Sequence, residues 1–290
     1  MNYVLTLVAD RTRTSLDAAT IAAVADAITA GRPDILAPGE AADLPCPAPP
    51  SPETLAAILG ARPIDAFCLP AEGRRKRLLT ADMDSTIITA EVIDELAAEA
   101  GIGAEIAAIT ARSMAGEIDF ADALRARVAR LGGTRLAALD RVAARLRSTE
   151  GARELIATMR AAGAVTALVS GGFSYFTARI AARLGFSAHF ANHLQDDGAT
   201  LTGAVAEPVL DRDAKARILR QLAASHAIPL AATMAIGDGA NDLDMLKTAG
   251  LGIAFRAKPV VAEAAQARIT HGSLRAALFA QGYHLAEFRE

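Results

Sequence analysis

The segment Asp82–Thr86 places two carboxylates two residues apart, directly after an apolar run that ends at Ala81. On an extended backbone, residues i and i+2 point to the same side, so Asp82 and Asp84 are expected to lie close together. Their repulsion raises one pKa unless a cation lies between them. The pair therefore suits a magnesium site, and it supplies one nucleophile and one proton-transferring group. An Asp-rich turn without catalytic function is the alternative.

A second polar cluster, Gly237–Asp242, also follows an apolar run. Its glycines allow the backbone to approach a ligand closely. Asp238, Asn241 and Asp242 supply three polar side chains within five residues. A plain turn would need neither Asn241 nor Asp242, so this cluster favours a functional site.

Two further features suit phosphate binding. Ser170 is followed by Gly171 and Gly172, which places a hydroxyl and free N–H groups at the start of a predicted helix. An ordinary strand-to-helix turn explains the glycines equally well, and Leu168 in place of a glycine argues against a serine-hydrolase elbow. Lys215 is one of four Lys in a chain with 26 Arg, and a compact ammonium suits a phosphoryl oxygen. A surface position on a helix is the alternative for Lys215.

A rival metal hypothesis rests on His189 and His193, whose spacing would suit zinc on a helix. They follow a Leu-Gly pair that is typical of a helix end, and Phe190 and Asn192 lie between them. We therefore expect a strand or loop here, without a metal.

The elements that must position these residues alternate between strands and helices. Leu78–Asp82, Val165–Ser170 and Thr233–Gly237 are short apolar runs that end in the polar clusters, and helical patterns such as Tyr175–Leu184 follow them. This alternation predicts an α/β fold with a doubly wound parallel sheet, in which ligands bind at the carboxyl ends of the strands. Helical periodicity without a strand signal predicts a helical cap over about residues 90–148, inserted after the first cluster.

The first 75 residues predict a separate, small α+β unit. Strand-like runs at Tyr3–Val8 and Ile64–Leu69 flank two helical patterns. Seven of the twelve prolines lie between Pro33 and Pro52, so we expect a loop or ragged edge there. We therefore divide the chain into an accessory domain, residues 1–75, and a larger domain, residues 76–290.

Composition excludes several classes of function. The 290 residues include 33 acidic and 30 basic side chains, and this balance argues against a nucleic acid or a membrane as the main partner. Two Cys form no disulfide framework, and the N-terminus has no basic region typical of a secretion signal. These features favour a reducing, cytoplasmic location.

With its four clusters in this order, the chain resembles the haloacid dehalogenase-like phosphohydrolases, and within them the family of phosphoserine phosphatases. The resemblance covers about Leu78–Gly272. The segments that carry it are Asp82–Thr86 with Glu91, Met114–Glu117, Leu124–Val128, Val169–Phe173 and Gly237–Asp242. In longer bacterial members, ACT-like (ferredoxin-like) modules precede the catalytic part. Residues 1–75 look like a degenerate module of this kind, short of strands, through which the chain could form a homodimer.

The resemblance implies a mechanism for the larger domain. Asp82 attacks phosphorus and becomes an aspartyl phosphate, while Asp84 protonates the leaving oxygen and later activates water. Mg²⁺ is held by Asp82, the backbone carbonyl of Asp84 and Asp238. Asp242 fixes a water or Lys215, which binds a phosphoryl oxygen.

The resemblance also implies how the substrate is held. Ser170 and the Gly171 N–H bind phosphoryl oxygens, and Asn241 contacts the substrate. The substrate, O-phosphoserine, carries an ammonium and a carboxylate, which Glu91 and Arg127 of the cap are expected to bind. Two alternatives stay open: a phosphatase of the same fold for another small phosphomonoester, such as phosphohomoserine, or a non-catalytic amino-acid sensor.

Overall fold

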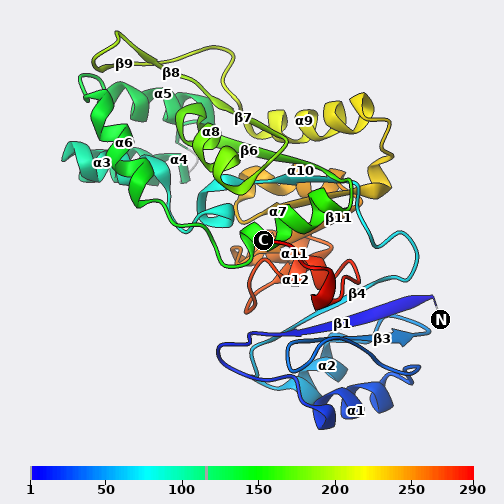
Figure 1. Ribbon diagram of the computed structural model, residues 1–290. Helices are drawn as coiled ribbons and strands as arrows, with labels where there is room; N and C mark the ends of the chain where they lie inside the picture. Colours follow the sequence, from blue (N-terminus) through cyan, green and yellow to red (C-terminus); the bar gives the residue numbers. More distant parts are fainter. Residues whose placement is uncertain (1, 115–116) are drawn as a thin grey trace.

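The computed structural model describes residues 2–114 and 117–290. The segment Met114–Glu117, which carries part of the resemblance, includes residues 115 and 116 and so lies partly outside the described residues. An α/β core occupies the centre, a helical cap lies at one end, and a smaller α+β unit lies at the other end (Figure 1). The predicted fold class is confirmed.

The core is built on a six-stranded parallel sheet with the order β12-β11-β10-β5-β6-β7. Its strands are β5 (Leu78–Ala81), β6 (Val165–Phe173), β7 (Ala188–Asn192), β10 (Thr233–Gly237), β11 (Leu251–Phe255) and β12 (Ala267–Ile269). The three strands predicted from apolar runs are β5, β6 and β10. Their apolar composition follows from burial on both faces of the sheet.

Helices cover both faces of this sheet. They are α7 (Ala152–Ala161), α8 (Ser174–Leu184), α9 (Arg212–Ser225), α10 (Leu243–Thr248), α11 (Pro259–Ala264) and the short C-terminal α12 (Ala276–Phe279). Adjacent residues of β5 enter different hydrophobic clusters: Leu79 packs with residues of α7 and α8, and Leu78 packs with residues of α9 and α10. This alternation is expected of a strand between two helical layers. The two helical layers hold the sheet between them, and the polar clusters lie at its carboxyl edge.

The cap is helical, as the periodicity predicts, and its described residues form four helices. They are α3 (Val92–Ala100), α4 (Gly103–Met114), α5 (Phe120–Arg130) and α6 (Leu136–Arg145). The chain leaves and re-enters the core along two paired segments, with an antiparallel bridge between Ile88 and Ser148. A hairpin of β8 (Leu194–Asp196) and β9 (Leu201–Val205) packs against α5, and the sequence did not predict it. Its strands have only three and five residues, which is too short for a clear apolar alternation.

The N-terminal unit has four strands in the order β2-β3-β1-β4, all antiparallel, with two helices. Its elements are β1 (Tyr3–Ala9), α1 (Ala18–Ala27), β2 (Asp34–Ala37), β3 (Ala41–Cys46), α2 (Pro52–Leu59) and β4 (Ile64–Pro70). This is the complete βαββαβ arrangement of a ferredoxin-like fold. The expectation of too few strands was therefore wrong.

The stretch between Pro33 and Pro52 is not a loop, because it contains β2 and β3. The alternative of a ragged edge is confirmed, since β2 is the edge strand of this sheet and its register with β3 shifts between Ile35 and Ala37. Pro45 lies in β3 opposite Val4 of β1, beyond the last residue that pairs with β2. Its missing N–H therefore faces no neighbouring strand on that side. Proline is tolerated at this local edge, although its density obscures the strand in the sequence.

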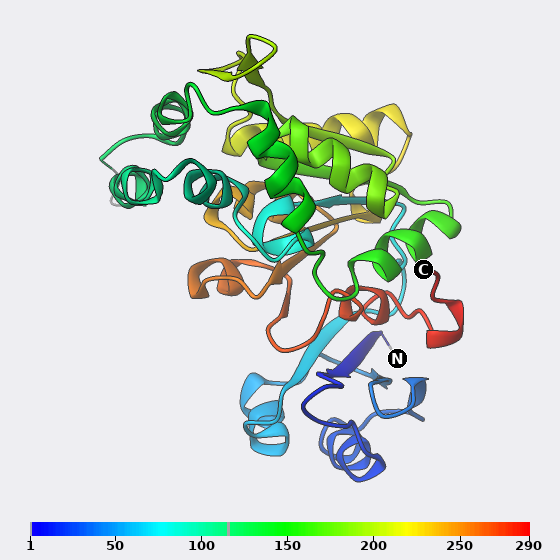
Figure 2. The same ribbon diagram turned by 60° about the vertical axis from the view of Figure 1, so that its left-hand side comes forward.

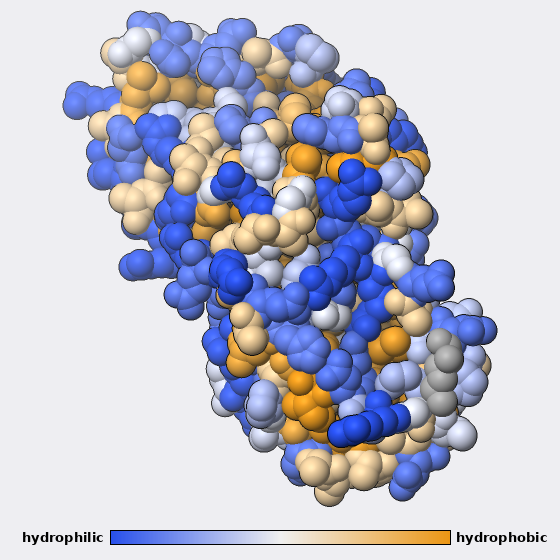
Figure 3. Space-filling model, turned by 45° about the vertical axis from the view of Figure 1, so that its right-hand side comes forward, coloured by the Kyte–Doolittle hydropathy of each residue, from blue (hydrophilic) through white to orange (hydrophobic). Residues whose placement is uncertain are grey.

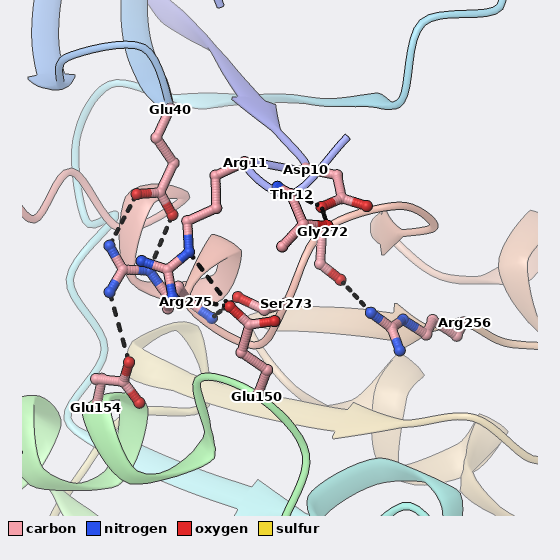
Figure 4. A network of polar contacts seen from close by, with 10 residues as sticks. All are labelled: Asp10, Arg11, Thr12, Glu40, Glu150, Glu154, Arg256, Gly272, Ser273 and Arg275. Carbon is pink, nitrogen blue, oxygen red and sulfur yellow. Dashed lines mark hydrogen bonds and ion pairs between the residues drawn. The ribbon is translucent and has the colours of Figure 1, made fainter. Parts of the chain in front are cut away.

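A network of polar contacts joins the two units, with a buried Arg275–Glu40 pair and an exposed Arg11–Glu150 pair (Figure 4). Arg275, which precedes α12, donates from Nε and Nη2 to the two carboxylate oxygens of Glu40, both at 2.8 Å, and its Nη1 lies 3.5 Å from Glu154. Arg11 pairs with Glu150 at 2.9 Å. The N-terminal unit thereby contacts the segment at the start of α7, just after the cap rejoins the core.

The N-terminal unit also binds the backbone that follows β12. The buried Asp65 carboxylate accepts hydrogen bonds from the N–H groups of Thr270 at 2.8 Å, His271 at 3.1 Å and Gly272 at 2.7 Å. Figures 1 and 2 both show the C-terminal segment (red) between the core and the N-terminal unit (blue). The two units are therefore held together by charges that neither could satisfy alone.

The molecule is elongated, with the N-terminal unit as its smaller lobe, and hydrophilic residues cover much of the face in Figure 3. Among the described residues, no helix has the length and apolar character that crossing a bilayer requires.

Candidate active site

A cavity of about 130 Å³ lies between the cap and the carboxyl edge of the core sheet. Its residues come from the turn after β5, the cap helices, the end of β6 and the turn after β10. The cavity is lined by Asp82, Asp84, Glu91, Ile93, Phe120, Leu124, Arg127, Gly171, Gly172, Phe173, Asp238 and Asn241. Acidic groups dominate the core side, and the cap adds one anion, one cation and apolar side chains.

The first carboxylate is positioned by the end of β5. Asp82 precedes a tight turn, Met83–Ile87, that closes with a hydrogen bond from the Ile88 N–H to the Met83 carbonyl at 2.9 Å. Within this turn Ser85 has φ +53°, an unusual backbone conformation for a residue other than glycine. The turn reverses the chain at the sheet edge, so that both Asp82 and Asp84 reach the cavity.

Asp84 is held by two donors from different elements. Its Oδ1 accepts from the Val92 N–H at 2.9 Å, and its Oδ2 accepts from the Ser170 hydroxyl at 3.0 Å. Burial, and next the charge of Glu91, raise the pKa of Asp84 to about 7. A carboxyl group with this pKa can release and take up a proton near neutral pH, as a general acid and base must.

Lys215 reaches the site from the first turn of α9 and is only 1% exposed. Its Nζ lies 2.8 Å from Oδ1 of Asp82 and 2.6 Å from Oδ1 of Asp242. Burial alone would lower the pKa of Lys215, but the carboxylates of Asp242 and Asp82 outweigh it and raise that pKa. Lys215 therefore stays charged and partly neutralises the acidic cluster.

Asp242 holds this arrangement together. Its Oδ1 binds Lys215, and its Oδ2 accepts from the Gly239 N–H at 3.0 Å. A side chain at Gly237 would place Cβ 2.4 Å from Cγ of Asp242, so glycine is required for this close approach. With both oxygens engaged, Asp242 positions Lys215 and the loop.

A cluster of carboxylates can hold a metal ion. Asp82, Asp238 and Asp242 each offer an oxygen, and these oxygens lie within 4.8 Å of one another. Burial, and then the charge of Asp242, raise the pKa of Asp238 to about 6 and raise that of Asp82 well above its usual value. The Thr86 hydroxyl orients Asp238 at 3.0 Å. An all-oxygen set with excess negative charge fits a hard divalent cation.

Ser170, Gly171 and Gly172 lie in the last residues of β6 and not at the start of a helix as expected, because α8 begins at Ser174. The Ser170 hydroxyl accepts from the Gly172 N–H at 2.8 Å while it donates to Asp84. The ring of Phe120 in the cap packs over Gly171, since a Cβ on Gly171 would lie 3.1 Å from it. A residue with a side chain would therefore not fit at Gly171 without a shift of Phe120.

The cap places one acidic and one basic group in the cavity. Glu91 precedes α3, and its Oε1 accepts from the Ser85 hydroxyl at 2.5 Å. Arg127 of α5 is half-buried, and its Nε donates to the Ala123 carbonyl at 3.2 Å. Burial lowers the pKa of Arg127, and the charges of Asp94 and Glu91 oppose this shift.

All ten residues singled out from the sequence lie in or directly behind this cavity. Asp82, Asp84, Glu91, Arg127, Gly171, Asp238 and Asn241 line it. Ser170 and Lys215 bond to residues that line it, and Asp242 bonds to Lys215 behind them. Sequence reasoning did not assign roles to Thr86 or Gly172, although both lie inside the quoted motifs.

His189 lies in β7, the edge strand of the core sheet, and His193 follows this strand directly. Each ring accepts or donates one contact through Nδ1, with Thr177 at 3.0 Å and Ser174 at 3.1 Å. Within the described part of the chain, neither belongs to a group of three potential metal ligands. The expectation of a strand or loop at these two residues is confirmed.

Known proteins share this arrangement. Residues 79–247 match the model of the haloacid dehalogenase-like hydrolases. Phosphoserine phosphatase of Archaeoglobus fulgidus is 46% identical over 69% of this chain and 58% of its own length. Phosphoserine phosphatase of Streptococcus thermophilus is 45% identical over 69% of this chain and 93% of its own length. The chain spans about half the length of several curated relatives that it matches.

A solved structure resembles nearly the whole chain. A hydrolase of this superfamily from Salmonella enterica covers 96% of this chain and 97% of its own, with a TM-score of 0.85 and 32% identity. The likeness therefore includes the N-terminal unit as well as the core. The chain belongs to the haloacid dehalogenase-like hydrolases, in the phosphoserine phosphatase family.

Proposed function

We propose that this chain hydrolyses O-phospho-L-serine to L-serine and phosphate, the last step of serine biosynthesis, with Mg²⁺ as its cofactor. One observation carries the proposal: Glu91 and Arg127 line the same small cavity as Asp82 and Asp84. The core pair suits any phosphomonoester. The cap pair suits a substrate with an ammonium and a carboxylate, and the names of the relatives point to the same substrate.

Asp82 acts as the nucleophile in this proposal. One oxygen, Oδ1, is bonded to the Met83 N–H and Lys215, which leaves Oδ2 without a hydrogen-bond partner among the described residues. Oδ2 attacks phosphorus, and the bond from phosphorus to the serine oxygen breaks. Asp84 donates its proton to that oxygen, so serine leaves as the alcohol. Asp84 then takes a proton from the water that cleaves the aspartyl phosphate.

Lys215, the Ser170 hydroxyl and the Gly171 N–H bind the phosphoryl oxygens and stabilise the charge that develops on them. Asp242 keeps Lys215 in place, at 2.6 Å. Asn241 lines the cavity beside the metal cluster and contacts the substrate.

Asp82, the backbone carbonyl of Asp84 and Asp238 would hold Mg²⁺. The bound ion supplies charge neutralisation and polarises the phosphoryl group. Thr86 keeps Asp238 turned toward the cluster through its 3.0 Å hydrogen bond. Asp242 stays outside the ligand set in this proposal, because both its oxygens already accept hydrogen bonds.

Substrate recognition falls to the cap. Glu91 binds the ammonium group, and Arg127 binds the carboxylate with two parallel N–H groups. Phe120 and Leu124 pack around the short carbon chain between them. This arrangement favours phosphoserine over phosphomonoesters that lack either charge.

Phosphate release from a panel of substrates tests the proposal. Phosphoserine, phosphothreonine and phosphoglycolate would be compared with p-nitrophenyl phosphate, each with Mg²⁺ and with a chelator. We expect the highest kcat/KM on phosphoserine and no release with the chelator. Equal kcat/KM on all four substrates would exclude recognition of phosphoserine by Glu91 and Arg127. No phosphate release from any of them would exclude phosphatase activity.

We further propose that residues 1–75 form an accessory domain beside a catalytic domain, residues 76–290. The support is a separate hydrophobic cluster in the N-terminal unit, which includes Leu5, Leu7, Val24 and Leu44. We also propose that the chain forms a homodimer through this unit, which light scattering would test.

We propose a cytoplasmic location as well. The free thiols Cys46 and Cys68 lie close together in the N-terminal sheet and fit a reducing compartment.

A further inference from the structure

Asn192, the last residue of β7, is 3% exposed and uses both ends of its side chain. Its Nδ2 donates to the Gly171 carbonyl at 2.8 Å, and its Oδ1 accepts from the Leu210 N–H at 2.6 Å. A buried amide with both ends bonded to backbone fixes those two backbone segments relative to each other. The two segments come from different parts of the chain and meet only in the fold.

The first bond leads toward Asp84. The Gly171 carbonyl and the Gly172 N–H belong to one peptide group, and that N–H donates to Ser170 Oγ at 2.8 Å. Ser170 Oγ donates in turn to Oδ2 of Asp84 at 3.0 Å. Asn192 thus begins a chain of hydrogen bonds that ends on the proton-transferring carboxyl. Successive bonds of such a chain polarise and orient one another.

The second bond leads toward Lys215. Leu210 is followed by Asp211, whose carboxylate caps α9 by accepting from the Ala214 N–H at 2.8 Å. Lys215 is the next residue along this first turn. The bond to Leu210 therefore fixes the start of the helix that carries the ammonium group. Asn192 itself does not line the cavity.

We propose that Asn192 is a positioning residue that holds the loop of Ser170 and Gly171 in register with α9 and Lys215. It sets the spacing of the phosphoryl-binding donors without touching the substrate. This inference rests on the proposed phosphatase function. Replacing Asn192 should impair binding of the phosphoryl group and so affect every phosphomonoester. Replacing Glu91 or Arg127 should affect only substrates that carry the matching charge.

Gln281 offers a matched control. It is 1% exposed and also bonds backbone at both ends, with the Lys76 N–H on Oε1 and the Ala277 carbonyl on Nε2, each at 2.9 Å. It lies in the C-terminal segment, away from the cavity. Replacing either amide by Ala removes two hydrogen bonds to backbone, and at Gln281 also a contact of 3.8 Å with Sδ of Met159. We expect similar losses of thermal stability. Only the replacement at Asn192 is expected to disturb phosphoryl binding.

The experiment compares Asn192→Ala, Asn192→Asp and Gln281→Ala with the unaltered chain. Inhibition by vanadate, a phosphate mimic, is measured with kcat and KM on phosphoserine and p-nitrophenyl phosphate. We expect Asn192→Ala to weaken vanadate binding about tenfold and to lower kcat/KM about equally on both substrates. Asn192→Asp keeps the acceptor for Leu210 but sets a carboxylate against the Gly171 carbonyl, so the same loss is expected. Gln281→Ala should stay within about twofold of the unaltered chain.

Two results would overturn the inference. One is an Asn192→Ala variant that loses stability like Gln281→Ala but keeps its vanadate affinity and kcat/KM. The other is an Asn192→Asp variant with unaltered kinetics. If the unaltered chain itself releases no phosphate, the proposed function fails instead, and direct calorimetry of vanadate binding to the same variants still tests Asn192.

Discussion

At the scale of single residues, the cation of the core, Lys215, and the cation of the cap, Arg127, are held in different ways. Lys215 lies within 2.8 Å of Asp82, whereas among the residues that the structure describes Arg127 donates only to the Ala123 carbonyl of its own helix. The core cation is therefore fixed before substrate arrives, while the guanidinium of the cap keeps donors free for a ligand. Reaction and recognition are expected to respond to different substitutions.

Arg127→Ala is expected to raise KM for phosphoserine about 100-fold, because a charged hydrogen-bonded pair with the carboxylate is lost. KM for p-nitrophenyl phosphate, which lacks a carboxylate, should change by less than about threefold. Arg130→Ala is the control, since Arg130 lies on the same helix and pairs with Glu105 at the surface. Equal losses on the two substrates would remove Arg127 from recognition.

At the scale of elements, the carboxyl edge of the sheet brings the motifs together. The turns after β5, β6 and β10 each contribute polar groups to one cavity, and α9 adds Lys215 from the side. Gly237, the last residue of β10, tolerates no side chain, because Asp242 from the following turn occupies that space. Packing of one loop therefore controls the position of Lys215.

Gly237→Ala is expected to abolish phosphate release and to lower Tm by several degrees, since its Cβ would lie 2.4 Å from Cγ of Asp242. Gly103→Ala is the control, because a Cβ there meets nothing within 4 Å and Ala favours the helix. Activity and thermal melts of both variants check this. An active Gly237→Ala variant would show that the close contact is not needed.

The sequence predicted the elements whose patterns are local. The strands β5, β6 and β10 are mainly apolar runs that lead into the polar clusters, so their type was visible. The end of β6 was not visible, because the predicted run stops at Ser170 whereas the strand continues to Phe173. The strands β2 and β3 were not visible, because proline density masks them. The contacts of Asn192 join residues 18 and 21 positions away, and no spacing in the chain encodes them.

At the scale of the whole molecule, the junction between the units depends on buried charges. Asp65→Ala leaves three backbone N–H groups after β12 without their acceptor, and we expect a loss of about 3 kcal/mol in the free energy of unfolding. The cavity is untouched, so kcat should stay the same. Urea unfolding checks the loss, with the exposed Asp26→Ala as control. Equal stability of the two variants would refute the role of Asp65 in the junction.

The acidic cluster links stability to pH and metal. Without metal, burial and neighbouring charges raise the pKa of Asp84 to about 7 and of Asp238 to about 6, from an ordinary value of 3.8. Between about pH 4 and about pH 7, the folded state therefore binds more protons at these two carboxyls than the unfolded state does. As the pH rises through this range, the free energy of unfolding of the metal-free chain falls. A bound cation needs ionised carboxylates and reverses this loss.

Mg²⁺ is therefore expected to raise Tm more at pH 8 than at pH 5. Thermal melts with Mg²⁺ and with a chelator at both pH values measure the difference. A gain that is equal at both pH values, or larger at pH 5, would contradict the assignment of the Asp82 and Asp238 carboxylates to the metal.

The central claim is that Asp82 carries the phosphoryl group covalently. The most direct measurement is an acid quench during turnover of phosphoserine, then borohydride reduction and mass spectrometry of the peptides. An acyl phosphate on Asp82 would be reduced to homoserine at position 82, and an Asp82→Asn variant, folded but inactive, should show none. Homoserine at another position, or turnover by Asp82→Asn, would contradict the claim.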